Sequence, residues 1–279
     1  MVNFPRTLHR HARIGRAARL VGACICAAAG ACAHRQHADT RAPGIEVMRS
    51  DEATIAIGVE QLHPELFGGA GAQGSALELL VTAGKDEGAR IELQYAALPG
   101  ENDGVQWTRT LIAPDGVRRP VERRTLVRMP DGSAAMSEVI DYPRRAVTKF
   151  NPPLTIMPAV LAPGERFTQT VAMEVRALRR DGSAGGVRDR GEATHDIMLG
   201  DIQRVRGTDD VGKAIGPWRS AVRIRTVFAS RLNTARAERI TERWFTPGEG
   251  LACEHYSETV AILAVMTSTE EQSIVRIAE

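Results

Sequence analysis

Cysteine is scarce in this sequence, and three of its four cysteines lie close to the N-terminus, at Cys24, Cys26 and Cys32. Only Cys253 lies in the body of the chain, so an intramolecular disulfide framework is excluded there. A domain of this length can bury a sufficient core without disulfides. The hydrophobic share of 43% argues against wholesale disorder.

Long hydrophobic runs are missing as well. The apolar stretch Leu20–Ala33 is shorter than the ~20 residues that a membrane-spanning helix needs. It follows five arginines, with no acidic residue before it, and it ends in a small-x-small pattern. This order of features is typical of a secretory signal peptide. We therefore predict a signal peptide at residues 1–33 and a flexible tether at residues 34–44.

A second interpretation of the same residues concerns lipidation. Ala29-Gly30-Ala31-Cys32 resembles a degenerate lipobox, in which Cys32 would be lipidated and become the first residue of the mature chain. Cleavage before His34 is the alternative. Both interpretations predict a periplasmic or extracellular protein, and lipidation adds membrane association through the N-terminus.

An excess of basic residues is lacking once the leader is set aside. The chain has 36 basic and 34 acidic residues, and five basic ones lie in the predicted signal peptide, which leaves 31 and a net charge of about −3. Domains that bind nucleic acid are expected to carry a net basic footprint. Nucleic acid is therefore not expected as a partner.

What the sequence does contain is a regular alternation of apolar residues with other residues. The apolar side chains would share one face of each strand, which is typical of antiparallel sheets with one buried face. We predict an all-β fold, with an antiparallel, strongly curved sheet that forms an incomplete barrel or a sandwich and little helix outside the signal peptide. The alternating segments are Ile55–Val59, Leu77–Val81, Ile91–Tyr95, Val171–Val175 and Val222–Phe228.

Turn residues and prolines predict how the strands are connected. Pairs such as Asp115-Gly116 recur between the alternating segments and reverse a chain easily. Prolines are dense in residues 143–163, where they disfavour a central strand. We predict one β-rich domain at residues 45–279 with a proline-rich connection at residues 143–163. The segment Thr234–Arg243 is the best helical candidate, but a strand competes because β-favouring residues follow it.

Patterns that would indicate a cofactor are weak. Gly69, Gly71 and Gly74 have the spacing of a dinucleotide-binding loop, but no alternation of strands and helices surrounds them. His195 and Asp196 are adjacent, and neighbours on a strand point to opposite faces. They are therefore not expected to orient one another as in a catalytic triad.

Catalysis and metal binding have no stronger support elsewhere in the sequence. Cys253 and His255 would share a strand face, which invites a thiol nucleophile, yet a small buried hydrophobe is the favoured interpretation of the cysteine. The histidines outside the leader lack a short metal-ligand spacing. We predict that the protein is not an enzyme and has no cofactor or metal, with a hydrolase as the remaining alternative.

Arginine is the one unusual enrichment, with a group of five close together and a second group in residues 219–243. The functional interpretation is a surface patch for an anionic partner of the cell envelope, such as lipid headgroups. The alternative is a solvated sheet face whose charges prevent aggregation. The five arginines of the predicted patch are Arg118, Arg119, Arg123, Arg124 and Arg128.

Two segments rich in proline and glycine resemble a family of uncharacterised exported bacterial β-rich proteins. They are Phe150–Glu165 and Trp244–Leu251, and the second has the form W-[YF]-x-P-G-x-G-L. The match departs after Leu251, where Ala252-Cys253 replaces the usual apolar–basic pair. The resemblance implies an exported β-domain and assigns no activity or catalytic residue.

Taken together, these features predict an exported envelope protein without enzymatic activity. Its expected partner is a lipid-like or other hydrophobic ligand, or a protein of the envelope, bound on the concave face of the curved sheet. The alternative is a structural or interaction domain whose core is filled.

Overall fold

The alternating segments form antiparallel strands along almost the whole described chain. The structure is a computed structural model, and it describes residues 42–54, 56–58, 62, 76–98, 104–262 and 266–277. The predicted signal peptide, Cys32, residues 34–41 of the tether and the glycines of residues 69–74 lie outside the described residues. Residues 41–279 belong to one compact unit.

The strands are short near the N-terminus and long near the C-terminus. The first nine are β1 (Ile45–Arg49), β2 (Ile57–Gly58), β3 (Ala76–Gly84), β4 (Arg90–Ala97), β5 (Gly104–Ile112), β6 (Arg118–Arg128), β7 (Ala134–Asp141), β8 (Ala146–Met157) and β9 (Val160–Leu161). The others are β10 (Arg166–Leu178), β11 (Ala184–Thr208), β12 (Ala214–Leu232), β13 (Ala235–Thr246), β14 (Gly250–Ile262) and β15 (Met266–Arg276).

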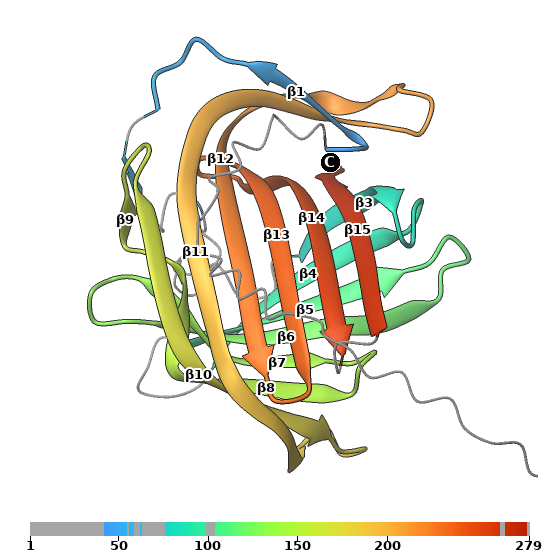
Figure 1. Cartoon of the computed structure of the whole chain (residues 1–279). Coiled ribbons are helices and arrows are strands. Elements are labelled where there is room, and N and C mark those ends of the chain that lie inside the picture. Colours follow the sequence, from blue (N-terminus) through green and yellow to red (C-terminus); the bar gives the residue numbers. More distant parts are fainter. Residues whose placement is uncertain are drawn as a thin grey trace, which may run out of the picture. The chain divides into compact units, whose positions relative to one another are not determined.

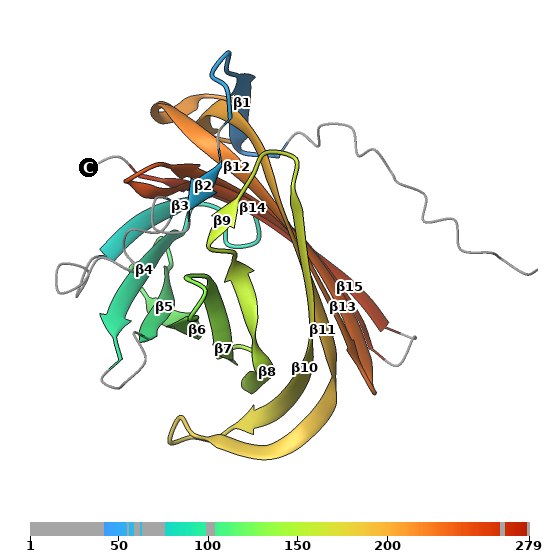
Figure 2. The ribbon, with the colours of Figure 1, turned by 90° about the vertical axis from the view of Figure 1, so that its left-hand side faces the viewer.

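The sheet closes into a barrel of 12 antiparallel strands. Neighbouring strands follow the order β11-β10-β8-β7-β6-β5-β4-β3-β15-β14-β13-β12, and β12 pairs with β11 again to complete the ring. The 25-residue strand β11 bends along the barrel and also pairs with β1 near its C-terminal end (Figures 1 and 2). The predicted all-β antiparallel, curved sheet is confirmed, and the sheet is closed instead of incomplete.

Inward and outward faces alternate along each strand, as the sequence predicted. On β11, Ala193, His195 and Ile197 are buried, whereas Thr194 and Asp196 between them are only half-buried. The same face is buried on the neighbouring strand, because Ile197 pairs with Thr226 of β12, which is also buried. The main apolar core therefore lies inside the barrel.

A second, smaller core lies on the outer face, under β1. Ala42 and Ile45 pack there with Trp244 and Cys253, and all four are less than 5% exposed. Residues 42–44, predicted to be part of a flexible tether, are therefore attached to the barrel. Gly44 approaches Thr82 so closely, with φ of +74°, that a Cβ atom would clash.

The proline-rich segment differs from the prediction, because residues 146–157 form strand β8 of the barrel and not a connection. Pairing of β8 with β10 ends at Asn151, just before Pro152 and Pro153. The register of β8 against β7 also shifts between Lys149 and Leu154. The two prolines thus occupy places where the ladder is interrupted, so that their missing N–H groups are tolerated.

The other connections agree with the sequence. Tight turns join β5 to β6, β6 to β7 and β13 to β14 at the predicted Pro-Asp-Gly and Pro-Gly sequences. The segment Thr234–Arg243, considered as a helix or a strand, lies almost entirely in β13 and is a strand. Residues 146–157 of the proline-rich segment belong to the barrel wall, whereas β9 (Val160–Leu161) pairs with β2 in a separate two-stranded sheet.

Candidate functional site

The inner face of the barrel changes from apolar to charged along its strands. On β13 the inward residues are, in turn, Phe245, Arg243, Thr241 and Arg239. Arg243 pairs directly with the buried Ile224 of β12 and so points to the same side of the sheet, and the other three lie two or four positions from Arg243 on the same face of the strand. The buried side chains of the apolar part are at most 8% exposed, and partly buried hydrophobic side chains pack against them. The charged part is the candidate site.

Glu254 of β14 is the centre of the charged part. It pairs with Arg243 across β13 and β14, and its Oε2 accepts a hydrogen bond of 2.6 Å from Nε of Arg243. Its Oε1 lies 3.4 Å from a nitrogen of Arg109 and 3.9 Å from a nitrogen of Arg239. Three guanidinium groups therefore surround one carboxylate.

Arg109 reaches the site from the other side of the barrel. Its strand, β5, is separated from β14 by β4, β3 and β15 in the sheet, so this ion pair crosses the interior. Arg109 also donates a hydrogen bond of 2.9 Å to Oε1 of Gln272, whose Nε2 donates to the carbonyl oxygen of Lys85 at 2.7 Å. These bonds fix the guanidinium of Arg109 in place.

Glu122 and Arg124 of β6 form a second pair on the inner face. Nε and a terminal nitrogen of Arg124 donate to the two carboxylate oxygens of Glu122 at 2.6 and 3.1 Å. The guanidinium also stacks over Trp107, 4.5 Å from the ring centroid. This two-bond geometry is the strong form of an arginine–carboxylate contact. We call the four arginines at positions 109, 124, 239 and 243, with Glu122 and Glu254, the arginine cluster.

Electrostatics in the arginine cluster keep its carboxylates ionised. Burial alone would raise the pKa of Glu254, but Arg243, Arg109 and Arg239 outweigh burial and hold the pKa well below its ordinary value. The pKa of Glu122 is lowered in the same way, with burial opposed mainly by Arg124. Both glutamates therefore carry a full negative charge at neutral pH.

Positive charge nevertheless exceeds negative charge in the arginine cluster. Four arginines against two ionised glutamates give a net charge of +2. The pKa of Arg243 is lowered, first by burial and then by the neighbouring charges of Arg124 and Arg239, although Glu254 opposes them. Repulsion among the arginines is therefore only partly compensated.

Solvent reaches some of these inward side chains. Arg239 and Arg243 keep 23% and 22% of their side-chain surface exposed, whereas Arg109 keeps 7%. Arg239 also lies over the ring of Tyr256, at 3.9 Å from its centroid. Arg239 and Arg243 thus keep part of their side-chain surface exposed, and the ring of Tyr256 holds Arg239 in position.

Apolar side chains border the arginine cluster. Phe228 pairs directly with Arg239 across β12 and β13, and it is only half-buried. It packs edge-on against Phe150, with ring centroids 6.4 Å apart. Two further half-buried residues of β10, Phe167 and Met173, pack against the same core. The accessible inner wall is therefore amphipathic, with charge and apolar surface side by side.

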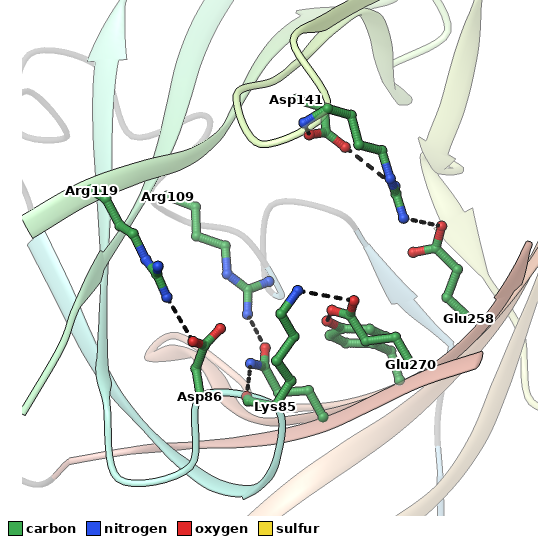
Figure 3. A network of polar contacts seen from close by, with 10 residues as sticks. Lys85, Asp86, Arg109, Arg119, Asp141, Glu258 and Glu270 are labelled. Carbon is green, nitrogen blue, oxygen red and sulfur yellow. Dashed lines mark hydrogen bonds and ion pairs between the residues drawn. The ribbon is translucent and has the colours of Figure 1, made fainter. Parts of the chain in front are cut away.

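Smaller ion pairs surround the arginine cluster (Figure 3). Lys85 and Glu270 point toward each other, with 3.2 Å between Nζ and Oε2, and Glu270 also accepts a hydrogen bond of 2.8 Å from Tyr256. Arg144 joins Asp141 and Glu258 at 3.2 and 3.1 Å. The Lys85–Glu270 pair is neutral, and the group of Arg144, Asp141 and Glu258 carries one positive and two negative charges, so the excess of positive charge belongs to the arginine cluster and is partly offset by this group.

The predicted surface patch does not form one surface. Arg124 points into the barrel, and Arg123 points outward on the opposite face of β6. The other three side chains are exposed at the ends of the same strand. Arg118 pairs with Glu92, Arg119 with Asp86 and Arg124 with Glu122, so acidic neighbours neutralise three of the five positive charges. These five arginines are Arg118, Arg119, Arg123, Arg124 and Arg128.

His195 and Asp196 point to opposite faces, as the sequence predicted. Nδ1 of His195 donates a hydrogen bond of 2.8 Å to the carbonyl oxygen of Thr155 inside the barrel. Asp196 faces outward, where Arg166 and Thr168 donate to it at 2.5 and 2.6 Å. The two residues therefore do not act as a pair.

Cys253 and His255 share the outer face of β14. Burial raises the pKa of the Cys253 thiol to about 12, so the thiol is protonated at neutral pH and is a poor nucleophile. His255 instead contacts Oγ of Ser273 at 3.0 Å and Oε1 of Glu271 at 3.3 Å. This Ser–His–Glu arrangement resembles a triad, but Ser273 is 0% exposed and offers no access to a substrate.

Within the residues that the structure describes, no group of three histidine, cysteine, aspartate or glutamate side chains is placed to hold a metal ion. The described part of the chain also contains no helix that is long and apolar enough to cross a membrane.

Comparison with known proteins finds no matching family model, no matching curated protein and no matching solved structure. The resemblance of Trp244–Leu251 to a family of exported proteins therefore stays a prediction. In the structure this segment is the end of β13, a tight turn and the start of β14.

Proposed function

We propose that the protein is a non-enzymatic binding protein that takes up an amphipathic anion inside its barrel. The observation that supports this proposal is the arginine cluster, whose unbalanced positive charge lies on the inner wall. An anionic group would contact the accessible guanidinium groups of Arg239 and Arg243. Its apolar part would lie against the half-buried Phe228 and Met173.

The balance of apolar and charged surface favours an amphipathic ligand over a purely hydrophobic one. Most apolar side chains of the interior are buried against one another, and half-buried ones such as Phe228 and Met173 leave a limited inner surface for an alkyl chain. The partly exposed inward side chains include Arg239 and Arg243, which share the single carboxylate of Glu254, so a further anion would be favourable beside them. We further propose that the protein is exported and acts in the cell envelope, which rests on the predicted leader.

A titration with ligands of equal chain length tests the proposal. Isothermal titration calorimetry should detect binding of octanoate and much weaker binding of octanol, because only octanoate brings a negative charge to the arginine cluster. Arg239→Gln should weaken octanoate binding about tenfold, through loss of one charge at a partly desolvated site.

Arg236→Gln is the matched control for this titration. Arg236 lies on the same strand, but its side chain is exposed on the outer face. Its removal should leave octanoate binding unchanged. If neither octanoate nor another octyl anion binds, or if both arginine variants lose affinity equally, the barrel interior is not the binding site and the filled structural domain becomes the better interpretation.

A further inference from the structure

Exposed arginines gather at the end of the barrel where the β10–β11 hairpin meets the β7–β8 turn. The backbone N–H of Leu178 donates a hydrogen bond of 2.8 Å to the carbonyl oxygen of Arg145. A guanidinium nitrogen of Arg188 donates to the carbonyl oxygen of Arg144 at 3.3 Å. These bonds fix the hairpin against the turn, and the hairpin projects beyond the end of β8 (Figures 1 and 2). We call the exposed side chains of Arg145, Arg179, Arg180 and Arg188 the arginine end.

The four guanidinium groups of the arginine end form no ion pair with a carboxylate in the described part of the chain. The nearest acidic residue is Asp181 in the turn of the hairpin. Hydrogen bonds from Ser183 and, to a smaller extent, the charge of Arg179 lower the pKa of Asp181. The carboxylate of Asp181 is therefore ionised at neutral pH and offsets one of the four positive charges.

Positive charge stays in excess when the neighbouring residues are included. Residues 141–145 and 174–190 contain seven arginines and four acidic residues. Glu258 of β14 adds a fifth negative charge beside Arg144. The Lys149–Glu138 pair of the neighbouring strands is neutral. The excess is therefore carried by arginines on the surface.

Arg145 occupies a backbone conformation that favours glycine. Its φ is +50°, and its N–H donates to the carbonyl oxygen of Tyr142, three residues earlier. The same bond closes four other hairpin turns of the described chain, and glycine is the residue with positive φ in each of them. These glycines are Gly116, Gly132, Gly182 and Gly212. A Cβ atom is disfavoured in this conformation, so the turn alone does not explain an arginine at this position.

We propose that the arginine end docks on a membrane surface of anionic phospholipids. Its guanidinium groups belong to two separate loops, so each can meet a different headgroup of a lipid surface. Val187, which is 40% exposed, lies in the same hairpin and offers an apolar contact. The barrel would be oriented with the β10–β11 hairpin toward the membrane. The inference does not depend on the anion site inside the barrel.

Vesicle binding of the full chain tests the inference. Binding should be tight to vesicles of equal parts phosphatidylcholine and phosphatidylglycerol, weak to phosphatidylcholine alone, and weaker as salt is added. Each arginine near an anionic surface contributes about fivefold in affinity. The double variant Arg179→Gln/Arg180→Gln should therefore bind the mixed vesicles about 25-fold more weakly.

Arg204→Gln/Lys213→Gln is the matched control. It also removes two exposed positive charges, but both lie toward the other end of β11 and in the turn that follows it. Its affinity for the mixed vesicles should equal that of wild type. All variants keep the same N-terminal residues, so their affinity ratios report on the barrel. Equal losses in the two double variants, or no loss in either, overturn the proposal.

Arg145→Gly separates the charge of Arg145 from its effect on folding. Glycine suits the positive φ, so the midpoint of urea unfolding should not fall. Binding to the mixed vesicles should nevertheless weaken about fivefold. Unchanged binding of this variant would show that Arg145 takes no part in docking and would overturn the surface as defined.

Amide hydrogen exchange locates the docked surface in the wild-type chain. The mixed vesicles should slow exchange at residues 179–183 and leave the turn at residues 209–213 unchanged. Equal protection of both turns, or none at residues 179–183, overturns docking through the arginine end even if the chain binds vesicles by another part.

Discussion

Glu254 and Arg243 face each other across β14 and β13, and a hydrogen bond of 2.6 Å joins Oε2 of the first to Nε of the second. Both are inward residues, and Glu254 is 4% exposed. The carboxylate is the only negative charge that Arg109, Arg239 and Arg243 share within the arginine cluster. Its removal should therefore affect stability far more than removal of a surface carboxylate.

We predict that Glu254→Gln lowers the free energy of unfolding by about 3–5 kcal/mol, because it leaves buried arginines without their counter-charge. Urea unfolding monitored by tryptophan fluorescence measures the change. Glu238→Gln is the control, since Glu238 is exposed on the outer face of β13, and it should change stability by less than about 0.5 kcal/mol. Equal stability of the two variants would show that Glu254 does not hold the arginines together.

The lowered pKa of Glu254 sets the sign of its pH dependence. Because the carboxyl group is more acidic in the folded state, its stabilisation is complete above the ordinary glutamate pKa of about 4.3 and is lost as the pH falls further. Wild type should lose stability steeply on acidification below this value. The Glu254→Gln variant should lose less.

His195 should make stability depend on pH in a different window. Burial lowers the pKa of His195 from 6.5 to about 4, although the hydrogen bond to Thr155 opposes this effect. The unfolded chain therefore binds a proton between pH 6.5 and 4 that the folded chain does not, and stability falls as the pH falls through this window. The loss should be about 3 kcal/mol in total.

His195→Gln tests this window, since glutamine can donate to the Thr155 carbonyl but does not titrate. Urea midpoints at pH 7, 6 and 5 should fall less steeply in this variant than in wild type. His255→Gln provides a comparison, because burial also lowers the pKa of His255 while Glu271 and Glu242 oppose it. Identical slopes for wild type and His195→Gln would mean that His195 is not buried in its neutral form.

Sequence reasoning predicted the strands better than the site, and Arg239 and Arg243 illustrate why. Alternation reveals which residues share a face, and it correctly separated His195 from Asp196. On β13, however, charged residues occupy both faces, with Arg239 and Arg243 inward and Glu238 and Glu242 outward. Alternation alone could not tell which face becomes the interior.

Arg109 was missed for a related reason. It lies in a strand with an ordinary mixture of apolar and polar residues, and its partners Glu254 and Gln272 are 145 and 163 residues away in the chain. Only the closure of the barrel brings them together. The same limitation applies to the arginines of β6, where the sequence grouped Arg123 with Arg124 although a strand directs neighbours to opposite sides.

The prolines of β8 are a third example of a feature that the sequence predicted only in part. Pro152 and Pro153 correctly indicated interrupted pairing, because β8 pairs with β10 only up to Asn151. They did not indicate that the chain leaves the sheet, since a register shift against β7 accommodates them. The local preferences of proline thus predicted that strand pairing is interrupted at these residues. Whether the chain stays in the sheet depends on its pairing with the neighbouring strands of the barrel.

Cys253 should be unreactive in the native protein. Its side chain is 1% exposed, it packs with Trp244 and Val275, and its pKa is raised to about 12. Iodoacetamide at pH 7.5 should therefore leave Cys253 unmodified in the folded protein and alkylate it in urea. Peptide mass mapping distinguishes it from the cysteines near the N-terminus. Rapid alkylation without denaturant would contradict this prediction and would support the interpretation of Cys253 as a nucleophile.

Asp189 should hold the β12–β13 turn against β11. Its Oδ2 accepts hydrogen bonds from the backbone N–H and the hydroxyl of Thr234 at 3.0 and 2.5 Å, and its Oδ1 accepts two from Asn233. The Thr234 hydroxyl is the main cause that lowers the pKa of Asp189 to about 2, with burial opposing it. This stabilisation is complete above the ordinary aspartate pKa of about 3.9 and is lost as the pH falls toward 2.

Asp189→Asn should release this turn, whereas Asp181→Asn should not affect it. Asp181 also accepts hydrogen bonds from a backbone N–H and a hydroxyl, but both belong to Ser183, two residues away. Asp189 instead joins residues 44 and 45 positions apart, so its loss opens a tertiary contact and should cost about 1–3 kcal/mol. Amide hydrogen exchange should accelerate at Asn233 and Thr234 in Asp189→Asn alone. If exchange at these two amides stays slow in that variant, strand pairing holds the turn without the carboxylate.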